Sequence, residues 1–232
     1  MKQFLILCII LMISATLFAD DQNDALWKKA AAIAAANWDW VPGSQETINL
    51  QKNKKGAVKS EENIKITITQ TEDGISSSLI SATRDGEVLD ENDDSVQSIL
   101  KEDKMPDNSS LFHNFEGRNL NVTRTEEIEE IDGYSCLAFS YAYIKDDEER
   151  GEMNATGKVW LDQETGAPIL NEMQIEPPKK MIKEISFNNH YFFDGTNWYM
   201  DNVQMKFRIS TLIFKLNVES TINYSEFWKY TP

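Results

Sequence analysis

The stretch Asn63-Ile-Lys-Ile-Thr-Ile-Thr69 decides the fold, because its isoleucines alternate with polar residues. A period of two is typical of a β-strand that buries one face and exposes the other. The same period recurs near the C-terminus, where Met205, Phe207 and Ile209 alternate with polar residues, and again over residues 212–219. No helical pattern separates these runs, so the sequence does not favour a parallel α/β sheet.

Tight turns are predicted between the strand-like runs. An Asp-Gly pair tolerates the positive φ angles that two-residue hairpin turns require. Several such turns in one chain favour an antiparallel meander, and therefore a mainly β (α+β) fold. The pairs are Asp73-Gly74, Asp85-Gly86, Asp132-Gly133 and Asp194-Gly195.

Two helices are expected beside the strands. Residues 24–37 are rich in alanine, and Asp24 is a suitable N-cap. The predicted buried stripe of this helix consists of Leu26, Ala30, Ile33 and Asn37. A second, short helix is predicted within the acidic stretch 85–110, with Asp94 as its cap.

The N-terminus has the pattern of a secretory signal. Residues 1–19 contain Lys2, an apolar run from Phe4 to Leu17 and a small residue, Ala19, before an acidic stretch. We therefore expect a cleaved signal peptide over 1–19 and one exported, soluble, periplasmic domain over 20–232. Only Cys136 then remains, and its apolar surroundings predict a buried, inert thiol.

The composition argues against several classes of function. Asp and Glu number 38 against 23 Lys and Arg, a net charge of −15, which disfavours both a free-standing nucleic-acid binder and docking to anionic lipids. Two Cys and two His disfavour a zinc site. His113 and His190 lack a neighbouring nucleophile motif. We expect no enzyme, cofactor or metal; an enzyme using paired carboxylates is the open alternative.

The segment Gly157–Leu170 carries a resemblance. It predicts a strand with Val159 and Leu161 on one face and Trp160 on the other, followed by a turn and a second strand. Its pattern G-x-V-W-L-D-x-x-T-G-x-P resembles a hairpin of the periplasmic LolA/LolB-like proteins, which include outer-membrane lipoprotein-sorting proteins and RseB/MucB-type regulators. The tail over residues 222–230 is similar to the end of such a domain.

The resemblance implies a curved, incompletely closed antiparallel β-barrel with helices covering its concave side. In this family the enclosed cavity holds acyl chains. Apolar alternation is also what any packed sheet shows, and the two early tryptophans also fit a plug against the core rim. The candidates for a cavity lining are Trp38, Trp40, Trp160, Phe187, Tyr191, Phe193, Trp198, Met205, Phe207, Phe214 and Leu216.

The expected function is that of a monomeric periplasmic carrier. It binds acyl chains of lipoproteins or lipids in a hydrophobic cavity and helps to move them towards the outer membrane. Its partners would be an acylated lipoprotein or lipid cargo and membrane-bound donor or acceptor proteins, without nucleic acid. The alternative is a lipid-sensing regulatory or surface interaction protein on the same fold, without transport.

Overall fold

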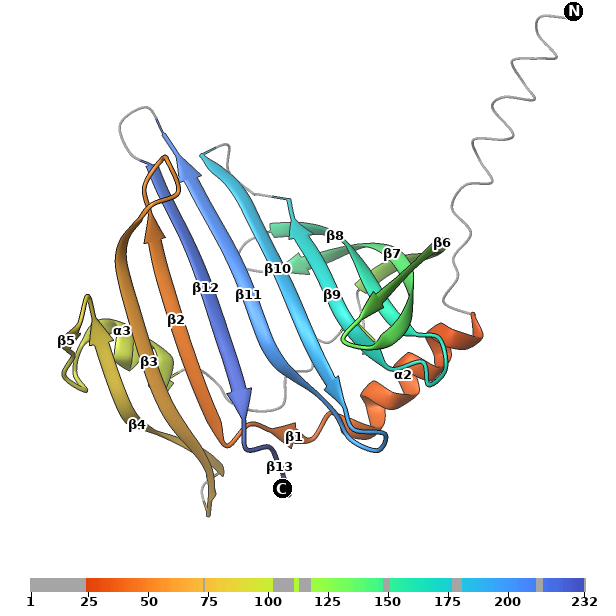
Figure 1. Ribbon diagram of the computed structural model, residues 1–232, viewed down its shortest axis with the longest axis horizontal. Coiled ribbons are helices and arrows are strands. Elements are labelled where there is room, and N and C mark those ends of the chain that lie inside the picture. The colour runs from red at the N-terminus through yellow and green to blue at the C-terminus, as the bar shows by residue number, and fades with distance from the viewer. Residues whose placement is uncertain are drawn as a thin grey trace, which may run out of the picture.

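The computed structural model describes residues 24–72, 74–101, 111–112, 118–147, 151–176, 181–211 and 215–231. Within these residues the chain forms two helices and thirteen strands (Figure 1). The predicted signal peptide, His113 and Phe214 lie outside the described residues.

Eleven strands form one antiparallel sheet in the order β5-β4-β3-β2-β12-β11-β10-β9-β8-β7-β6. This confirms the predicted mainly β, antiparallel fold. Strands β5 and β6 are the two edges, so the sheet is open; a concave side covered by helices stays a prediction. The strands are β2 (Ser44–Lys52), β3 (Val58–Thr71), β4 (Gly74–Arg84), β5 (Glu87–Val88), β6 (Arg118–Ile131), β7 (Tyr134–Asp147), β8 (Gly151–Asp162), β9 (Pro168–Ile175), β10 (Ile182–Phe193), β11 (Trp198–Ser210) and β12 (Lys215–Ser225).

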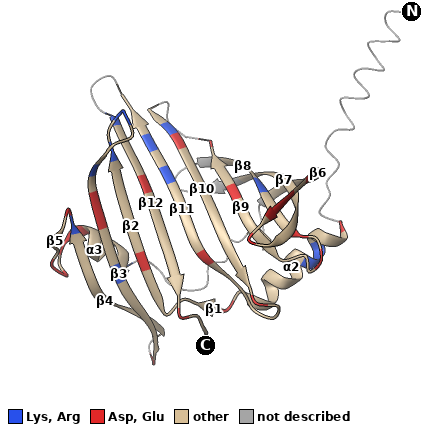
Figure 2. Ribbon diagram, viewed as in Figure 1, with Lys and Arg blue, Asp and Glu red and all other residues tan. Residues whose placement is uncertain are grey.

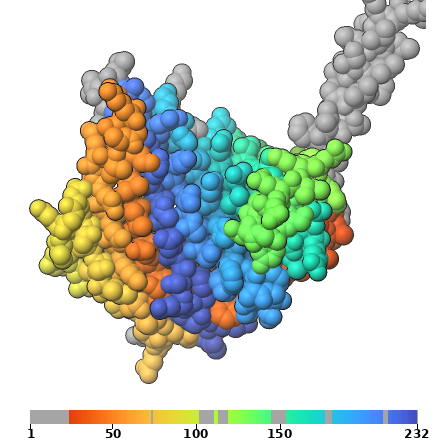
Figure 3. Space-filling model, in the orientation of Figure 1, coloured from red at the N-terminus to blue at the C-terminus, as the bar shows by residue number. Residues whose placement is uncertain are grey.

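The meander is interrupted once, at the centre of the sheet. Strand β2 pairs with β12 over nine residue pairs, from Asn217 opposite Lys52 to Ser225 opposite Ser44. A second sheet consists of β1 (Trp40–Val41) and β13 (Trp228–Lys229). Figure 3 shows the consequence: the β4–β5 and β6–β7 hairpins stand at opposite edges of the molecule.

One row of register partners crosses nine strands and identifies a common face. Residues directly opposite each other in an antiparallel pair project to the same side of a sheet. We call this side the helix face, because both helices pack on it, and the other side the open face. The row runs Phe139–Val159–Asn171–Asn189–Val203–Ile222–Thr47–Ile64–Ala82.

Helix α2 (Ala25–Asn37) covers one end of the helix face (Figure 1). As predicted, Asp24 is its N-cap, and its carboxylate accepts a hydrogen bond from the Leu26 N–H at 2.7 Å. Trp27 and Ala30 pack against Phe139 and strand β8. The predicted stripe is partly wrong: the buried residues are Trp27, Ala30, Ala34 and Asn37.

Helix α3 (Asp94–Lys101) covers the other end of the helix face. Its Val96 is fully buried against Ile64, Ile66 and Ile68, which confirms the predicted buried face of that strand. The expected cap is wrong by one residue: the Asp93 carboxylate, rather than Asp94, accepts a hydrogen bond from the backbone N–H of residue 95 at 3.0 Å.

An ion-pair network ties α3 to the sheet. The Arg84 guanidinium lies 2.7 Å from the Glu62 carboxylate and 3.1 Å from that of Asp93. Hydrogen bonds from Arg84 to Glu62, and then to Asp93, raise the pKa of Arg84. Arg84 therefore holds the start of α3 beside β3 and β4 as a permanent cation.

Asp85-Gly86 and Asp132-Gly133 form the expected two-residue turns, whereas Asp194-Gly195 begins a longer connection from β10 to β11. Asp132 and Gly133 have φ angles of 50° and 85°, and Asp85 has a φ angle of 53°. Positive φ at both central residues is the geometry of a type I′ hairpin turn. Asp73 lies outside the described residues, but its partner Gly74 also has a positive φ.

The thiol of Cys136 is buried, as predicted. Its desolvation, with a further contribution from the charge of Asp162, raises its pKa to about 12. Because only the thiolate is a strong nucleophile, this group is chemically quiet at neutral pH.

Gly157 offers a test of the packing between β7 and β9. A Cβ atom at this position would collide with the ring of Tyr141 and with the backbone oxygen of Glu172. We expect Gly157→Ala to lower the free energy of unfolding by about 1–3 kcal/mol, measured by chemical denaturation. The control is the exposed neighbour Thr156, and Thr156→Ala should change the free energy of unfolding by less than about 0.5 kcal/mol. An equal effect of both variants would contradict this packing.

Candidate functional site

An apolar strip lies on the helix face between the two helices. Its members pair across β10, β11 and β12: Phe187 lies opposite Met205, and Phe207 lies between Ile185 and Val218. All are half-buried, and none belongs to the three buried core clusters. We call this the central strip, and it consists of Ile185, Phe187, Met205, Phe207, Ile209, Leu216 and Val218.

Four predicted lining residues belong to the central strip. They are Phe187, Met205, Phe207 and Leu216, so the structure brings these side chains together as the alternation suggested. Ile185 was not predicted from the sequence as a lining residue. Its spacing of two from Phe187 was the signal that could have identified it.

Three other predicted lining residues lie on the same face but nearer α2. Tyr191 and Trp198 are buried, and their rings stack with centroids 4.6 Å apart. The Trp198 indole donates a hydrogen bond to the Pro168 carbonyl at 2.8 Å, and its backbone N–H donates to the Asn37 side chain at 3.1 Å. Phe193 packs against the same cluster. Tyr191, Trp198 and Phe193 are therefore part of the packed core near α2.

The remaining tryptophans lie away from the central strip. Trp160 is buried on the opposite side of β8 from Val159, as predicted, in a cluster with Cys136. Trp40 pairs with Lys229 in the small sheet, and its ring centroid lies 6.1 Å from that of Tyr199. Trp38 is 46% exposed. Their role in ligand binding stays a prediction.

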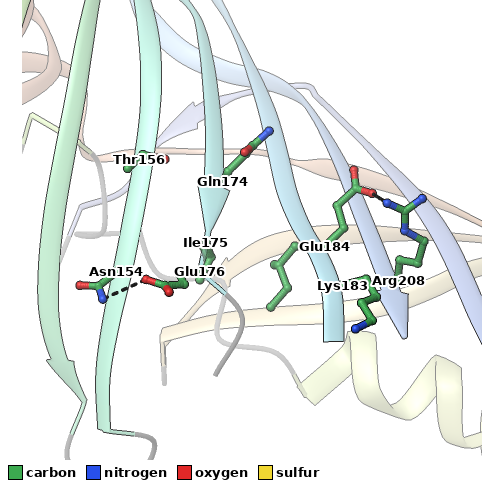
Figure 4. A pocket seen from close by; sticks show the side chains of 9 residues that line it. Asn154, Thr156, Gln174, Ile175, Glu176, Lys183, Glu184 and Arg208 are labelled. Atoms are coloured by element: carbon green, nitrogen blue, oxygen red, sulfur yellow. Dashed lines mark hydrogen bonds and ion pairs between the residues drawn. The ribbon is translucent and has the colours of Figure 1, made fainter. Parts of the chain in front are cut away.

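A polar cleft adjoins the central strip where two strands diverge. Strands β9 and β10 pair only as far as Gln174 and Ser186, whereas β10 continues along β11 to Ile182. The gap is a cleft of ≈ 520 Å³ (Figure 4). Ile185 of the central strip is among its lining residues, which are otherwise mostly polar: Asn154, Thr156, Gln174, Ile175, Glu176, Lys183, Glu184 and Arg208.

Two polar contacts define the walls of this cleft. The Arg208 guanidinium lies 2.9 Å from the Glu184 carboxylate. On the other side, the Asn154 amide donates to the Glu176 carboxylate at 3.2 Å (Figure 4). Glu184 and Arg208 alternate with Ile185 and Phe207 along their strands, so the charged wall of the cleft projects to the open face.

The open face carries a second polar cleft around His190. Its volume is ≈ 310 Å³, and Leu170, Asn188, Asn202 and Gln204 complete the lining. The His190 ring bridges two carboxylates, with Nδ1 2.7 Å from Asp201 and Nε2 2.5 Å from Asp132. Asp132 lies in the β6–β7 turn, so His190 holds that turn against β10 and β11. The imidazole of His190 therefore has a structural role in the described chain.

A register shift explains the position of Asp201. Between β10 and β11 the pairs change from His190–Asn202 to Tyr191–Met200, so Asp201 is an extra residue in its strand. A bulge re-aims side chains, and here it brings the Asp201 carboxylate to the imidazole. Burial alone lowers the pKa of His190, but the hydrogen bonds to Asp201 and Asp132 outweigh it, so the pKa is raised.

Neither a metal-ligand cluster nor a membrane-spanning helix is found in the described part of the chain. No three His, Cys, Asp or Glu side chains there are grouped to hold a metal ion. The helices in these ranges are too short or too polar to cross a bilayer.

Comparisons with known proteins leave the family open. No protein-family profile and no curated protein matches the sequence. A MucA/MucB complex from Pseudomonas aeruginosa is similar at 10% identity and a TM-score of 0.24, covering 92% of this chain and 100% of that one. MucB in complex with MucA(peri) gives 9% identity and a TM-score of 0.22, covering 89% and 98%. These TM-scores are too low to establish a shared fold, so the resemblance of the 157–170 hairpin stays a hypothesis.

The His190 bridge predicts a pH-dependent stability. The pKa of His190 is higher in the folded chain than its value of about 6.5 in the unfolded chain, so the protonated imidazole stabilises the fold. This stabilisation is complete at pH values below about 6.5, and it is lost as the pH rises through the pKa of the folded chain. We expect His190→Gln to lower the free energy of unfolding by up to about 1 kcal/mol near pH 6 and by less near pH 9. Urea denaturation at both pH values measures this. The control is Gln204→Ala, which changes the same cleft but removes no titrating group. It should lower the free energy of unfolding by the same amount at both pH values. An effect of His190→Gln that does not depend on pH would contradict the bridge.

Proposed function

We propose that this chain is a non-enzymatic, exported carrier that binds acyl chains of lipids or lipoproteins on the central strip. The single observation that carries the proposal is the strip itself. Seven apolar side chains form one contiguous surface on the helix face, yet belong to none of the buried core clusters. A soluble protein seldom presents such a surface without a ligand or partner for it.

The residue types of the strip suit a flexible apolar chain. Transfer of each methylene from water to an apolar surface contributes about 0.8 kcal/mol. Phe187 and Phe207 supply large rings, and Met205 adapts its shape to different contacts. A pairing such as Phe187–Met205 is therefore better matched to acyl chains of several kinds than to one rigid ligand.

The polar cleft supports an amphiphilic ligand. Ile185 belongs both to the central strip and to the cleft that Lys183 and Arg208 line. An acyl chain on the strip would thus leave its polar end where β9 and β10 diverge, next to Lys183, with Arg208 across the sheet on the open face. This would orient the ligand with its head towards the open ends of β9 and β10.

The chemistry of the described residues supports binding without a covalent step. Burial keeps the Cys136 thiol protonated, because its pKa is about 12. Both ring nitrogens of His190 contact carboxylates that hold the fold together. The predicted signal over residues 1–19 supports export to the periplasm, where a carrier would move such cargo towards the outer membrane.

The sensing alternative differs from transport in the step after binding. A carrier releases its bound acyl probe to acceptor vesicles, whereas a regulatory protein on the same fold binds the probe without transfer. Mixing the loaded chain with lipid vesicles and measuring probe fluorescence over time separates the two.

The central strip predicts which substitution weakens ligand binding. We expect Phe207→Ala to weaken binding of cis-parinaric acid by at least about tenfold, since a buried aromatic side chain contributes about 1.5–3 kcal/mol. Fluorescence titration measures the dissociation constant. The control is Phe192→Ala, because Phe192 pairs with Tyr199 on the open face and is 44% exposed.

Two outcomes of that titration would count against the proposal. One is an equal effect of Phe207→Ala and Phe192→Ala. The other is the absence of binding by the unmodified chain. If Phe207→Ala loses its cooperative thermal unfolding, Leu216→Ser repeats the test on the neighbouring strand β12, and a folded Leu216→Ser variant with unchanged binding would also count against the proposal.

A further inference from the structure

Lysines gather at one end of the central strands, although the chain as a whole is acidic. Strand β2 ends and β3 begins at this end, and here β11 also ends and β12 begins. Figure 2 shows Lys and Arg concentrated towards the ends of β2, β12 and β11 that lie furthest from the C-terminus. We call Lys54, Lys55, Lys59 and Lys215 the basic tip.

The four lysines are exposed and unpaired within the described structure. Each is exposed, and none has a carboxylate within 4.0 Å among the residues described. Carboxylates on the neighbouring strands are partly neutralised, because Glu219 pairs with Lys52 and Glu184 pairs with Arg208. The tip therefore keeps a local excess of positive charge.

The loop that carries two of these lysines is ordered by its own hydrogen bonds. The Asn53 side chain accepts hydrogen bonds from the backbone N–H of Lys55 at 2.8 Å and of Ala57 at 3.1 Å. The loop therefore presents Lys54 and Lys55 at a defined position beyond the sheet.

Exposed apolar side chains lie beside the lysines. Val58 is 52% exposed and Met181 is 49% exposed. Val58 lies opposite Lys52, and the Met181 carbonyl accepts a hydrogen bond from Ser210, whose partner is Lys215. Since strands are spaced about 4.8 Å apart, the two apolar residues flank the tip about 19 Å from each other.

We propose that the basic tip docks on the surface of an anionic lipid bilayer. Lysine ammonium groups are attracted to anionic headgroups, and apolar side chains among them enter the interface. An acidic protein would satisfy the lysines but leave Val58 and Met181 without an apolar partner. The combination therefore favours a membrane surface, and such docking does not depend on acyl-chain binding by the central strip.

The net charge of −15 does not oppose such docking, because charge acts locally in salt solution. The Debye length is about 10 Å at 0.1 M salt. Two described carboxylates, those of Glu61 and Asp85, lie beside Lys59, because Asp85 accepts hydrogen bonds from Ser60 and from the Glu61 backbone N–H. The positive excess therefore rests on Lys54, Lys55 and Lys215. The tip therefore acts as a basic surface, while the acidic remainder orients it towards the bilayer.

Vesicle flotation tests the proposal. We expect the chain from residue 20 to bind vesicles of phosphatidylcholine with phosphatidylglycerol, not those of phosphatidylcholine alone, and to dissociate between ~0.1 M and ~0.5 M NaCl. The triple variant Lys54→Gln, Lys55→Gln, Lys215→Gln should lower the partition coefficient about a hundredfold. The double variant Val58→Ser, Met181→Ser should also lower the partition coefficient.

A matched variant controls for net charge. Lys28, Lys65 and Lys101 are exposed but lie outside the tip, so their triple replacement by Gln should leave vesicle binding unchanged. Three results would overturn the proposal. The two triple variants could lose vesicle binding equally, or the unmodified chain could bind neutral vesicles as well as anionic ones. The chain could also bind polyglutamate with an affinity that the Val58 and Met181 substitutions do not change. The tip variants should keep their affinity for cis-parinaric acid, and the Phe207→Ala variant should keep its vesicle binding. A failure of the membrane-docking proposal can therefore be distinguished from a failure of the acyl-chain-binding proposal.

Discussion

The pairing of β2 with β12 is the constraint on which the rest of this structure depends. It joins the N-terminal strands, which carry α3, to the seven-stranded meander that packs on α2. Its register places Thr47 opposite Ile222, so the isoleucines of β3 share a face with the apolar residues of β11. A shift of one residue would turn one half of the sheet over and place α3 and α2 on opposite sides.

The shared face explains why the candidate binding surface lies where it does. Each helix covers one end of the sheet, and α3 is further held by the Arg84 ion pairs. The strands between them retain apolar side chains such as Phe187 and Phe207 on the helix face. Beside them, the early divergence of β9 from β10 opens a polar cleft. Ile185 therefore marks where the apolar strip on the helix face reaches this cleft, whose Glu184–Arg208 ion pair lies on the open face.

Electrostatics act at particular places in this molecule and are poorly described by its net charge. His190 joins two carboxylates, and its protonation couples the β6–β7 turn to β10 and β11. At the end of the central strands, Lys54 and Lys215 belong to a basic tip on an acidic chain. The expectation that the negative charge disfavours contact with anionic lipids considered the average surface, whereas the proposed docking depends on the local charge of this end.

The sequence by itself determined the features that depend on neighbouring residues. Alternation identified the strands around Ile64 and Met205, the Asp-Gly pairs identified hairpin turns, and Asp24 identified the start of α2, because strand periodicity, turn angles and capping are local properties. Alternation also named Phe187, Met205, Phe207 and Leu216 as candidates for one surface. Only the tertiary structure decided that Trp198 is anchored in the core, that Trp40 lies in a separate sheet and that α3 is capped by Asp93. It also decided that β2 joins β12 and that dispersed lysines meet at one end. These outcomes depend on register between residues far apart in the chain, which local patterns do not specify.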